Sequence, residues 1–244
     1  QDKRRFLVVT LDMAGNWPPE LALIRELVQR GHEVRVMSNA SHAEQIAAAG
    51  AVYHPYQYVR QFMRTGRPDN EQESGRTRLL REVFLNPAFG DALLGAVERD
   101  TPDVLLVDAM LLTAAAAAES TGLPTATLWH SVYGAQMESL LRFGGPMLEP
   151  LNAVRAKLGL ARVMDRRDSV ERSHAILAFT YEAFDTAPQA PLSQLYYVGP
   201  LACLPQRLPP YALPWPPSDA RPLILVSYST VFQNQGAILQ RVAD

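Results

Sequence analysis

The fold is decided by residues 6–37, which read FLVVTLDMAGNWPPELALIRELVQRGHEVRVM. The first six residues are an aliphatic and β-branched run, which is typical of a strand buried on both faces. A polar turn follows, and Pro18-Pro19 can open a helix because proline is tolerated in the first helical turn. Gly31 predicts the end of that helix, and residues 33–37 form a second strand. The order strand, helix, strand predicts the first unit of a parallel sheet.

Strands and helices continue to alternate beyond this unit. The sequence predicts further strands at 51–54, 104–107, 125–128, 175–179, 196–198 and 223–228. It also predicts helices at 41–49, 78–99, 113–121 and 235–242, and helical periodicity through 133–173. This alternation favours an α/β architecture. We expect a Rossmann-like, doubly wound parallel sheet with helices on both faces and the first strand near its centre.

A proline-rich segment divides the chain. Residues 201–222 contain seven prolines, a composition typical of an extended, semi-rigid linker. We therefore expect a Rossmann-like domain over residues 1–200, an interdomain linker over 201–222, and the truncated start of a second domain over 223–244. The polar residues 60–78 read as a surface loop.

The composition excludes several classes of protein. The net charge of −2 lacks the basic excess of most nucleic-acid-binding domains. No apolar segment approaches the roughly 20 residues of a membrane-spanning helix. The single cysteine, Cys203, excludes a disulfide framework and fits a reducing compartment. We expect a cytoplasmic protein with no nucleic-acid and no membrane partner.

Candidate site residues follow the carboxyl ends of predicted strands, where ligands bind in such sheets. Asp12 and Asn16 follow the first strand, Asp108 ends the strand at 104–107, and His130 follows the strand at 125–128. Each also has a structural interpretation: Asp12 and Asn16 as turn or capping residues, Asp108 as the cap of the next helix, and His130 as a half-buried histidine. Their shared position at three strand ends favours one polar cleft.

Other site motifs are absent from the sequence. The first turn lacks the glycines of G-x-G-x-x-G, and its two prolines remove backbone donors that would hold a pyrophosphate. Walker A, H-E-x-x-H and G-x-S-x-G are missing, and no cysteine or histidine spacing is typical of zinc. We expect no metal and no bound cofactor.

Motifs spread over almost the whole chain carry a resemblance. Residues 15–23 read GNWPPELAL, 30–34 RGHEV, 102–108 PDVLLVD, 122–124 GLP, 197–200 YVGP and 225–230 LVSYST. In this order they resemble the motifs of UDP-glycosyltransferase-like enzymes of the GT-B fold. In that family a G-H-x-x-P turn precedes a helix ending in R-G-H-x-V, and a P-D-x-x-x-x-D strand follows. Within that family, the motifs resemble those of bacterial enzymes that glycosylate polyketides and other natural products.

The resemblance implies that this chain is the acceptor-binding half of a glycosyltransferase. In the family, a base takes the proton of an acceptor hydroxyl, whose oxygen attacks the anomeric carbon of a nucleotide sugar with inversion. The base is usually the histidine of G-H-x-x-P, oriented by the aspartate that ends the later strand. Asp108 matches that aspartate. Asn16 stands in place of the histidine, and an amide cannot serve as a general base at neutral pH.

Asn16 leaves the identity of the base open. Asp108 could act directly, Asp12 could reach in from the same loop, or His130 could supply the base from the adjacent strand. An acceptor that is acidic, or nucleophilic at carbon, would need little help. The alternative is a catalytically silent relative that acts as a binding or activator partner.

Further residues are assigned from the resemblance and from their place near the strand ends. The donor is expected to be a UDP- or TDP-sugar, with Gly15, Ser229 and Thr230 as the candidate donor-binding residues in this chain. The acceptor is expected to be a small hydrophobic molecule, aromatic or polyketide-like, because pockets of this kind are mostly apolar. The candidate acceptor-binding residues are Trp17, Phe62, Met110, Trp129, Tyr133, Met137 and Phe143.

Overall fold

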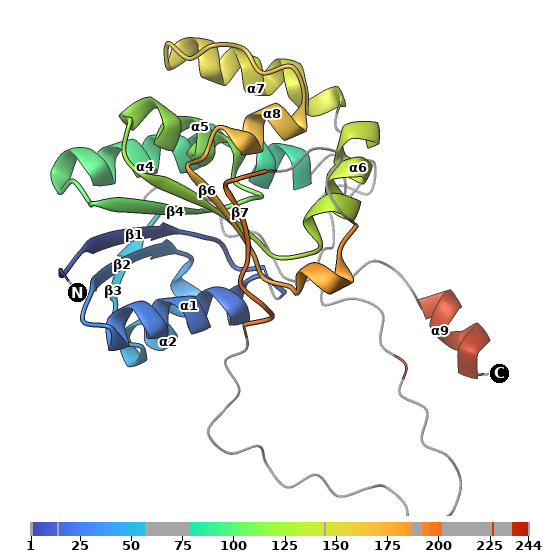
Figure 1. The fold of residues 1–244 in the computed structure, drawn as a ribbon, viewed down its shortest axis with the longest axis horizontal. Helices are drawn as coiled ribbons and strands as arrows, with labels where there is room; N and C mark the ends of the chain where they lie inside the picture. The colour runs from blue at the N-terminus through green and yellow to red at the C-terminus, as the bar shows by residue number, and fades with distance from the viewer. Residues whose placement is uncertain are drawn as a thin grey trace, which may run out of the picture.

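A single parallel sheet organises the chain (Figure 1). The structure, a computed structural model, describes residues 2–13, 15–56, 79–143, 145–186, 192–201, 226 and 236–243. Its strands are β1 (Arg5–Val9), β2 (Glu33–Ser38), β3 (Val52–Pro55), β4 (Val104–Asp108), β5 (Thr125–Trp129), β6 (Ala175–Ala178) and β7 (Leu195–Tyr197). Their order is β3-β2-β1-β4-β5-β6-β7, and every pairing is parallel. The predicted fold class is therefore confirmed.

Helices cover both faces of the sheet, as predicted. The helices are α1 (Trp17–Gln29), α2 (Ala43–Ala48), α4 (Pro87–Arg99), α5 (Leu112–Thr121), α6 (Tyr133–Phe143), α7 (Gly145–Lys157), α8 (Arg166–Glu171) and α9 (Gly236–Ala243). Helices α1 and α2 pack on one face of the sheet, and α4 and α5 on the other (Figure 1). Among the residues that the structure describes, no helix is long and apolar enough to cross a bilayer.

The two faces follow from the alternation of side chains along β1. Val8 belongs to the core under α1 and α2, whereas Leu7 and Val9 belong to the core under α4 and α5. All three are fully buried, so the strand shows no polar alternation in its sequence. Burying each such side chain contributes about 1.5–3 kcal/mol.

The strand order places a topological switch point between β1 and β4. The chain runs from β1 outward to β2 and β3, then returns to add β4 on the opposite side of β1. The carboxyl ends of β1 and β4 therefore open a crevice between their crossover connections, which is where such sheets bind ligands.

The helix predicted at 78–99 is wrong as one continuous element. The structure has a π-helical turn at Leu80–Phe84, then a break, and α4 begins at Pro87. Proline has no N–H to donate and disfavours helical geometry in the preceding residue, so a helix cannot pass through it undisturbed. Asn86 adopts extended geometry and caps α4, its Oδ1 accepting the N–H of Ala88 at 3.1 Å.

The carboxylate of Asp185, from a segment distant in sequence, fixes the position of the first turn of α6. The backbone N–H groups of Gly134 and Ala135 donate to Asp185 at 2.9–3.2 Å, which satisfies the first turn of the helix. A β-carbon on Gly134 would lie 1.9 Å from the carbonyl oxygen of Thr186. Glycine is therefore required where the 182–186 segment meets α6.

A buried ion pair joins α5 to α7. Arg155 is 2% exposed and donates to both carboxylate oxygens of Glu119, at 2.6 and 2.9 Å. Its Nε also donates to the carbonyl of Ala161 at 2.8 Å. This arginine holds α7 and the loop after it against the helix that packs on the sheet.

The division into domains stays a prediction. Of the linker expected at 201–222, only Leu201 lies within the described residues. The strand expected at 223–228 also falls outside them, apart from Val226, which is not in a strand. Helix α9 agrees with the helix predicted near the end of the sequence.

Candidate active site

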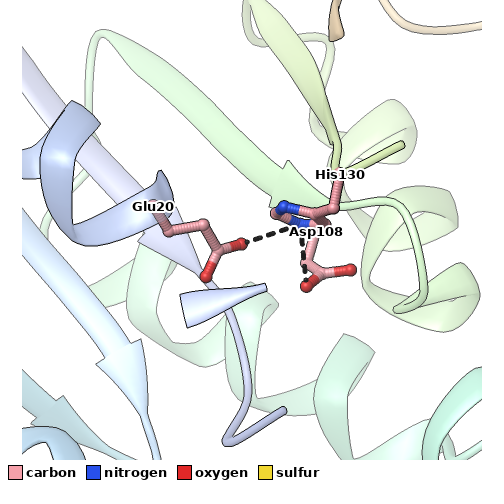
Figure 2. Close-up of side chains that lie close together, drawn as sticks. All are labelled: Glu20, Asp108 and His130. Atoms are coloured by element: carbon pink, nitrogen blue, oxygen red, sulfur yellow. Dashed lines mark ion pairs between the residues drawn. The ribbon is translucent and has the colours of Figure 1, made fainter. Parts of the chain in front are cut away.

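Four polar side chains meet at the switch point. Asp108 is the last residue of β4, His130 follows β5, and Asn16 and Glu20 come from the start of α1. Because β1, β4 and β5 are neighbours, their carboxyl ends and the helix that follows β1 share one edge of the sheet. Figure 2 shows Glu20, Asp108 and His130 pointing toward one another from three separate elements.

The side chain of Asn16 is hydrogen-bonded to Asp108. Its Nδ2 donates to Asp108 Oδ2 at 2.9 Å and also approaches Met110 Sδ at 3.3 Å. Although Asn16 occupies the N-cap position of α1, its side chain makes no capping hydrogen bond. The side chain of Asn16 therefore does not cap the helix, and it bonds to Asp108 in the site instead.

Asp108 has both a structural and a site role. Its Oδ1 accepts the backbone N–H of Met110 at 2.7 Å, which is the turn interaction expected of a residue preceding a helix. Its Oδ2 takes the Asn16 hydrogen bond and faces His130. The side chain is fully buried, so both oxygens are held in place.

His130 bridges two buried carboxylates. Its Nε2 lies 3.2 Å from Asp108 Oδ2 and 3.3 Å from Glu20 Oε1 (Figure 2). Neither approach has hydrogen-bond alignment, so both contacts are ion pairs. Glu20 is fully buried, and its Oε2 accepts a short hydrogen bond from the hydroxyl of Thr10. The Thr10 carbonyl in turn accepts the hydroxyl of Tyr56.

This arrangement shifts the pKa values of Glu20, Asp108 and His130 away from their ordinary values. Burial by itself raises the pKa of Glu20, and although His130 opposes it, the value rises to about 7. Burial lowers the pKa of His130, but the charge and contact of Asp108, with Glu20, outweigh it and raise the value to about 10. Burial also raises the pKa of Asp108, yet His130, Met110 and Asn16 hold it below its usual range. At neutral pH, His130 is a cation and Asp108 an anion.

The same three side chains have the donor types of a metal site. One ligand atom from each of Glu20, Asp108 and His130 lies within 4.8 Å of the others, close enough for a shared cation. His130 would first have to lose its proton, since only the neutral imidazole binds metal. The charge of the imidazolium already balances one of the two carboxylates.

Asp12 serves a different group of side chains. Its Oδ2 accepts the hydroxyl of Ser41 at 2.6 Å, its Oδ1 lies 3.4 Å from His42 Nε2, and its backbone N–H donates to Asn39 at 2.7 Å. These partners lie between the end of β2 and the start of α2. Asp12 therefore holds the loop after β1, and none of its described contacts is to the Asp108 cluster.

The candidate acceptor residues divide into two groups. Met110 borders Asn16, and Trp17 stacks on His42 with ring centroids 3.8 Å apart. Trp129, Tyr133 and Met137 instead lie in the core between α6, α8 and the sheet, each 2% exposed or less. This burial leaves them little surface for an acceptor, and their binding role stays a prediction.

The remaining candidates cannot be placed. Phe62, Ser229 and Thr230 lie outside the described residues, as does the side chain of Phe143. Gly15 is exposed in the turn before α1. Its donor-binding role stays a prediction.

Sequence reasoning missed Glu20. Leu21 and Ile24 mark the buried stripe of α1, and Glu20 lies one turn before Ile24 on that stripe. A glutamate among the core-facing positions of an amphipathic helix is a signal, because a buried carboxylate requires a partner. Thr10 was missed for the simpler reason that a threonine near the end of a strand is ordinary.

A known protein resembles this chain in sequence over part of its length. No protein-family model matches it. The 4'-demethylrebeccamycin synthase of Lentzea aerocolonigenes is 31% identical over 140 residues, which is 53% of this chain and 33% of that protein. The chain thus spans about a third of the length of this curated relative.

Solved structures resemble the chain in fold. The glycotransferase of kitacinnamycin superposes with a TM-score of 0.65 at 22% identity, covering 89% of this chain and 56% of that one. The calicheamicin glycosyltransferase gives a TM-score of 0.64 at 20% identity, covering 82% and 53%. The resemblance to GT-B glycosyltransferases is confirmed. The chain spans about half the length of these GT-B structures, and at this level of identity they establish its fold.

Proposed function

We propose that the chain forms the acceptor side of a glycosyltransferase that moves a sugar from a nucleotide sugar to a small hydrophobic natural-product acceptor with inversion. The observation that carries the proposal is the hydrogen bond between Asn16 and Asp108 at the switch point. These are the two positions where the resemblance puts the base and the aspartate that orients it. The pairing survives in this chain with an amide in place of an imidazole.

Asn16 is suited to orient an acceptor hydroxyl. Asp108 is ionised and can only accept hydrogen bonds, so it fixes the amide with Nδ2 toward it. The Oδ1 atom of Asn16 is then left to accept the acceptor's O–H. This contact positions the nucleophile, and positioning alone can contribute substantially to the rate.

The site lacks a strong exposed base among its described groups. His130 is already protonated at neutral pH, and its side chain is only 9% exposed. The Asp108 carboxylate is fully buried, and its low pKa makes it a weak base. We infer an acceptor that releases its proton readily, such as a phenolic hydroxyl on an aromatic natural product.

The reaction balances with these roles. The acceptor oxygen bonds to the anomeric carbon while the bond from that carbon to the nucleoside diphosphate breaks, and the leaving phosphate oxygen keeps the electron pair. The acceptor proton passes to Asp108 Oδ2 or to solvent. Attack on the face opposite the leaving group inverts the anomeric centre.

A second candidate function is a catalytically silent relative that binds or activates a partner. The observation that favours it is Asn16 itself, since an amide cannot accept the proton. Failure of the full-length protein to transfer sugar from any donor, while it still binds aromatic acceptors, would support this candidate.

Transfer assays on the full-length protein test the proposal. Wild type is incubated with UDP- and TDP-sugars and matched phenolic and aliphatic acceptors, and we expect turnover with the phenol. Asp108→Asn keeps the shape and removes the charge, and we expect the rate to fall about 10²-fold or more. The matched control is Asp91→Asn, an exposed position on α4 across the sheet.

Two comparison variants separate the alternatives for the base. Asp12→Asn should change the rate only through loop stability, because Asp12 contacts a separate group of residues. The reasoning fails if Asp108→Asn keeps a rate within a few-fold of wild type while a folded Asp12→Asn or His130→Ala variant is inactive. In that case the base is not Asp108.

A further inference from the structure

Three atoms of the buried cluster make no hydrogen bond, and only one of them, Glu20 Oε1, is a carboxylate oxygen; the other two are the ring nitrogens of His130. Glu20 Oε2 accepts from Thr10, Asp108 Oδ1 accepts from Met110, and Asp108 Oδ2 accepts from Asn16. Glu20 Oε1 is fully buried, faces His130 Nε2 at 3.3 Å, and accepts no hydrogen bond. A buried carboxylate oxygen in this state is the natural place for one more proton.

We propose that Glu20 is a positioning residue that takes up and releases a proton at Oε1, and that this proton decides how strongly His130 holds Asp108. The inference rests on the proposed function, because Asp108 is the group through which Glu20 would affect sugar transfer. Glu20 itself is fully buried and needs no contact with substrate.

The charge of the cluster supports the proposal. With both carboxylates ionised and His130 protonated, the three groups carry one negative charge in excess. The polar groups that face Glu20 within the described part of the chain are His130, Asp108 and the Thr10 hydroxyl, and the buried Tyr56 hydroxyl bonds the Thr10 carbonyl behind them. Uptake of one proton would neutralise the cluster, which a buried site favours.

The two states of Glu20 have different consequences for Asp108. When Glu20 is ionised, the His130 cation is shared between two carboxylates, so Asp108 keeps more of its basicity. When Glu20 is protonated, the full charge of His130 acts on Asp108 and weakens it as a proton acceptor. The pKa of Glu20, raised by burial to about 7, places the change near neutral pH.

Infrared spectroscopy tests the proton position without any turnover. In wild type, we expect the C=O stretch of a buried protonated carboxyl to appear as the pH falls through about 7. Glu20→Gln should lose this band. The matched control, Glu26→Gln, lies on the same helix but is exposed and paired with Arg30, and it should keep the band.

A second variant guards against misfolding of Glu20→Gln. Thr10→Val removes the hydroxyl that donates to Glu20 Oε2 and keeps the side-chain shape. Because that hydrogen bond favours the ionised carboxylate, the midpoint of the band should move to higher pH. Absence of the band from wild type between about pH 5 and 8, or its survival in Glu20→Gln, would overturn the proposal.

Kinetics of the full-length protein add the functional readout. Below the midpoint, the wild-type rate should fall with pH and level off at the low rate of Glu20→Gln, because protonation of Glu20 weakens Asp108 without removing it. In Glu20→Gln the rate should be low and flat over the same range. If the infrared band titrates but no donor gives turnover, the transferase proposal is refuted, whereas the proposed proton uptake at Glu20 is supported. Turnover whose acid limb is unchanged in Glu20→Gln would overturn the coupling.

Discussion

If the full-length protein is the glycosyltransferase proposed above, replacing Asn16 with histidine is expected to raise its rate of sugar transfer. The Nδ2 of Asn16 lies 2.9 Å from Asp108 Oδ2. In histidine the Nδ1 atom branches from the same carbon as this nitrogen, so an Nδ1–H can donate to the same oxygen. The ring's Nε2 would then be unprotonated and turned away from Asp108, where it can accept the acceptor's proton.

The size of the gain follows from the surroundings of Asp108. A well-placed general base typically contributes about 10²–10⁴-fold. Two features of the site reduce this range. The His130 cation lies 3.2 Å from Asp108 and partly neutralises its charge. Asp108 would therefore raise the pKa of the new imidazole less than an unpaired aspartate would. The sulfur of Met110, 3.3 Å from the amide, must also move to admit the larger side chain. We expect a gain of about 10–10²-fold.

The assay compares initial rates on an aliphatic acceptor, for which a base matters most. Asn16→Gln is the matched control, because it changes the size of the side chain and keeps an amide. The gain should vanish when Asp108→Asn is added to Asn16→His. A folded Asn16→His variant with an unchanged or lower rate would refute the reasoning, as would an equal gain in Asn16→Gln.

Three further predictions concern stability. Arg155→Met should lower the free energy of unfolding by about 3 kcal/mol in urea titrations, because it leaves Glu119 half-buried without its cation; a loss under about 1 kcal/mol would contradict this. Gly134→Ala should lower the melting temperature despite the better helix propensity of alanine, because the added carbon meets the carbonyl of Thr186, and an unchanged melting curve would count against that contact. For Glu20, whose folded pKa of about 7 exceeds the ordinary glutamate value of 4.5, the stabilising contribution is complete below pH 4.5 and is lost as the pH rises to about 7. Glu20→Gln should therefore gain stability relative to wild type over that interval, and parallel curves would argue against it.

Much of the fold could be predicted because the sheet is buried on both faces. Runs such as Leu7 to Val9 have no polar alternation, which separates parallel strands from most other strands. The meeting of Asn16, Asp108 and His130 followed from one geometric rule, that strand ends share an edge.

The rest depended on information that local patterns do not contain. Glu20 lies within a helix, whereas the rule used to predict the site selects residues that follow the ends of strands. Trp129, Tyr133 and Met137 have the apolar character of a cleft and of a core alike, and only packing against Val170 and other core residues distinguishes the two. Pro87 is a sequence signal for the break before α4, because proline disfavours helical geometry in the residue before it.

The cluster also constrains the order in which the chain can assemble. Helix α1 buries Glu20 against the sheet. The cation that faces Glu20 is His130, which follows β5. Asp108, the partner of Asn16, lies 92 residues further along the chain. If α1 docked firmly on β1 and β2 alone, Glu20 would be buried without its histidine, either as an uncompensated charge or as a neutral acid with an unpartnered oxygen, and both are unfavourable. The first βαβ unit should therefore stay loosely docked during synthesis until β4 and β5 have joined the sheet. Pulsed hydrogen exchange should then show the amides of α1 gaining protection together with those of β5, and later than proximity in sequence alone would suggest.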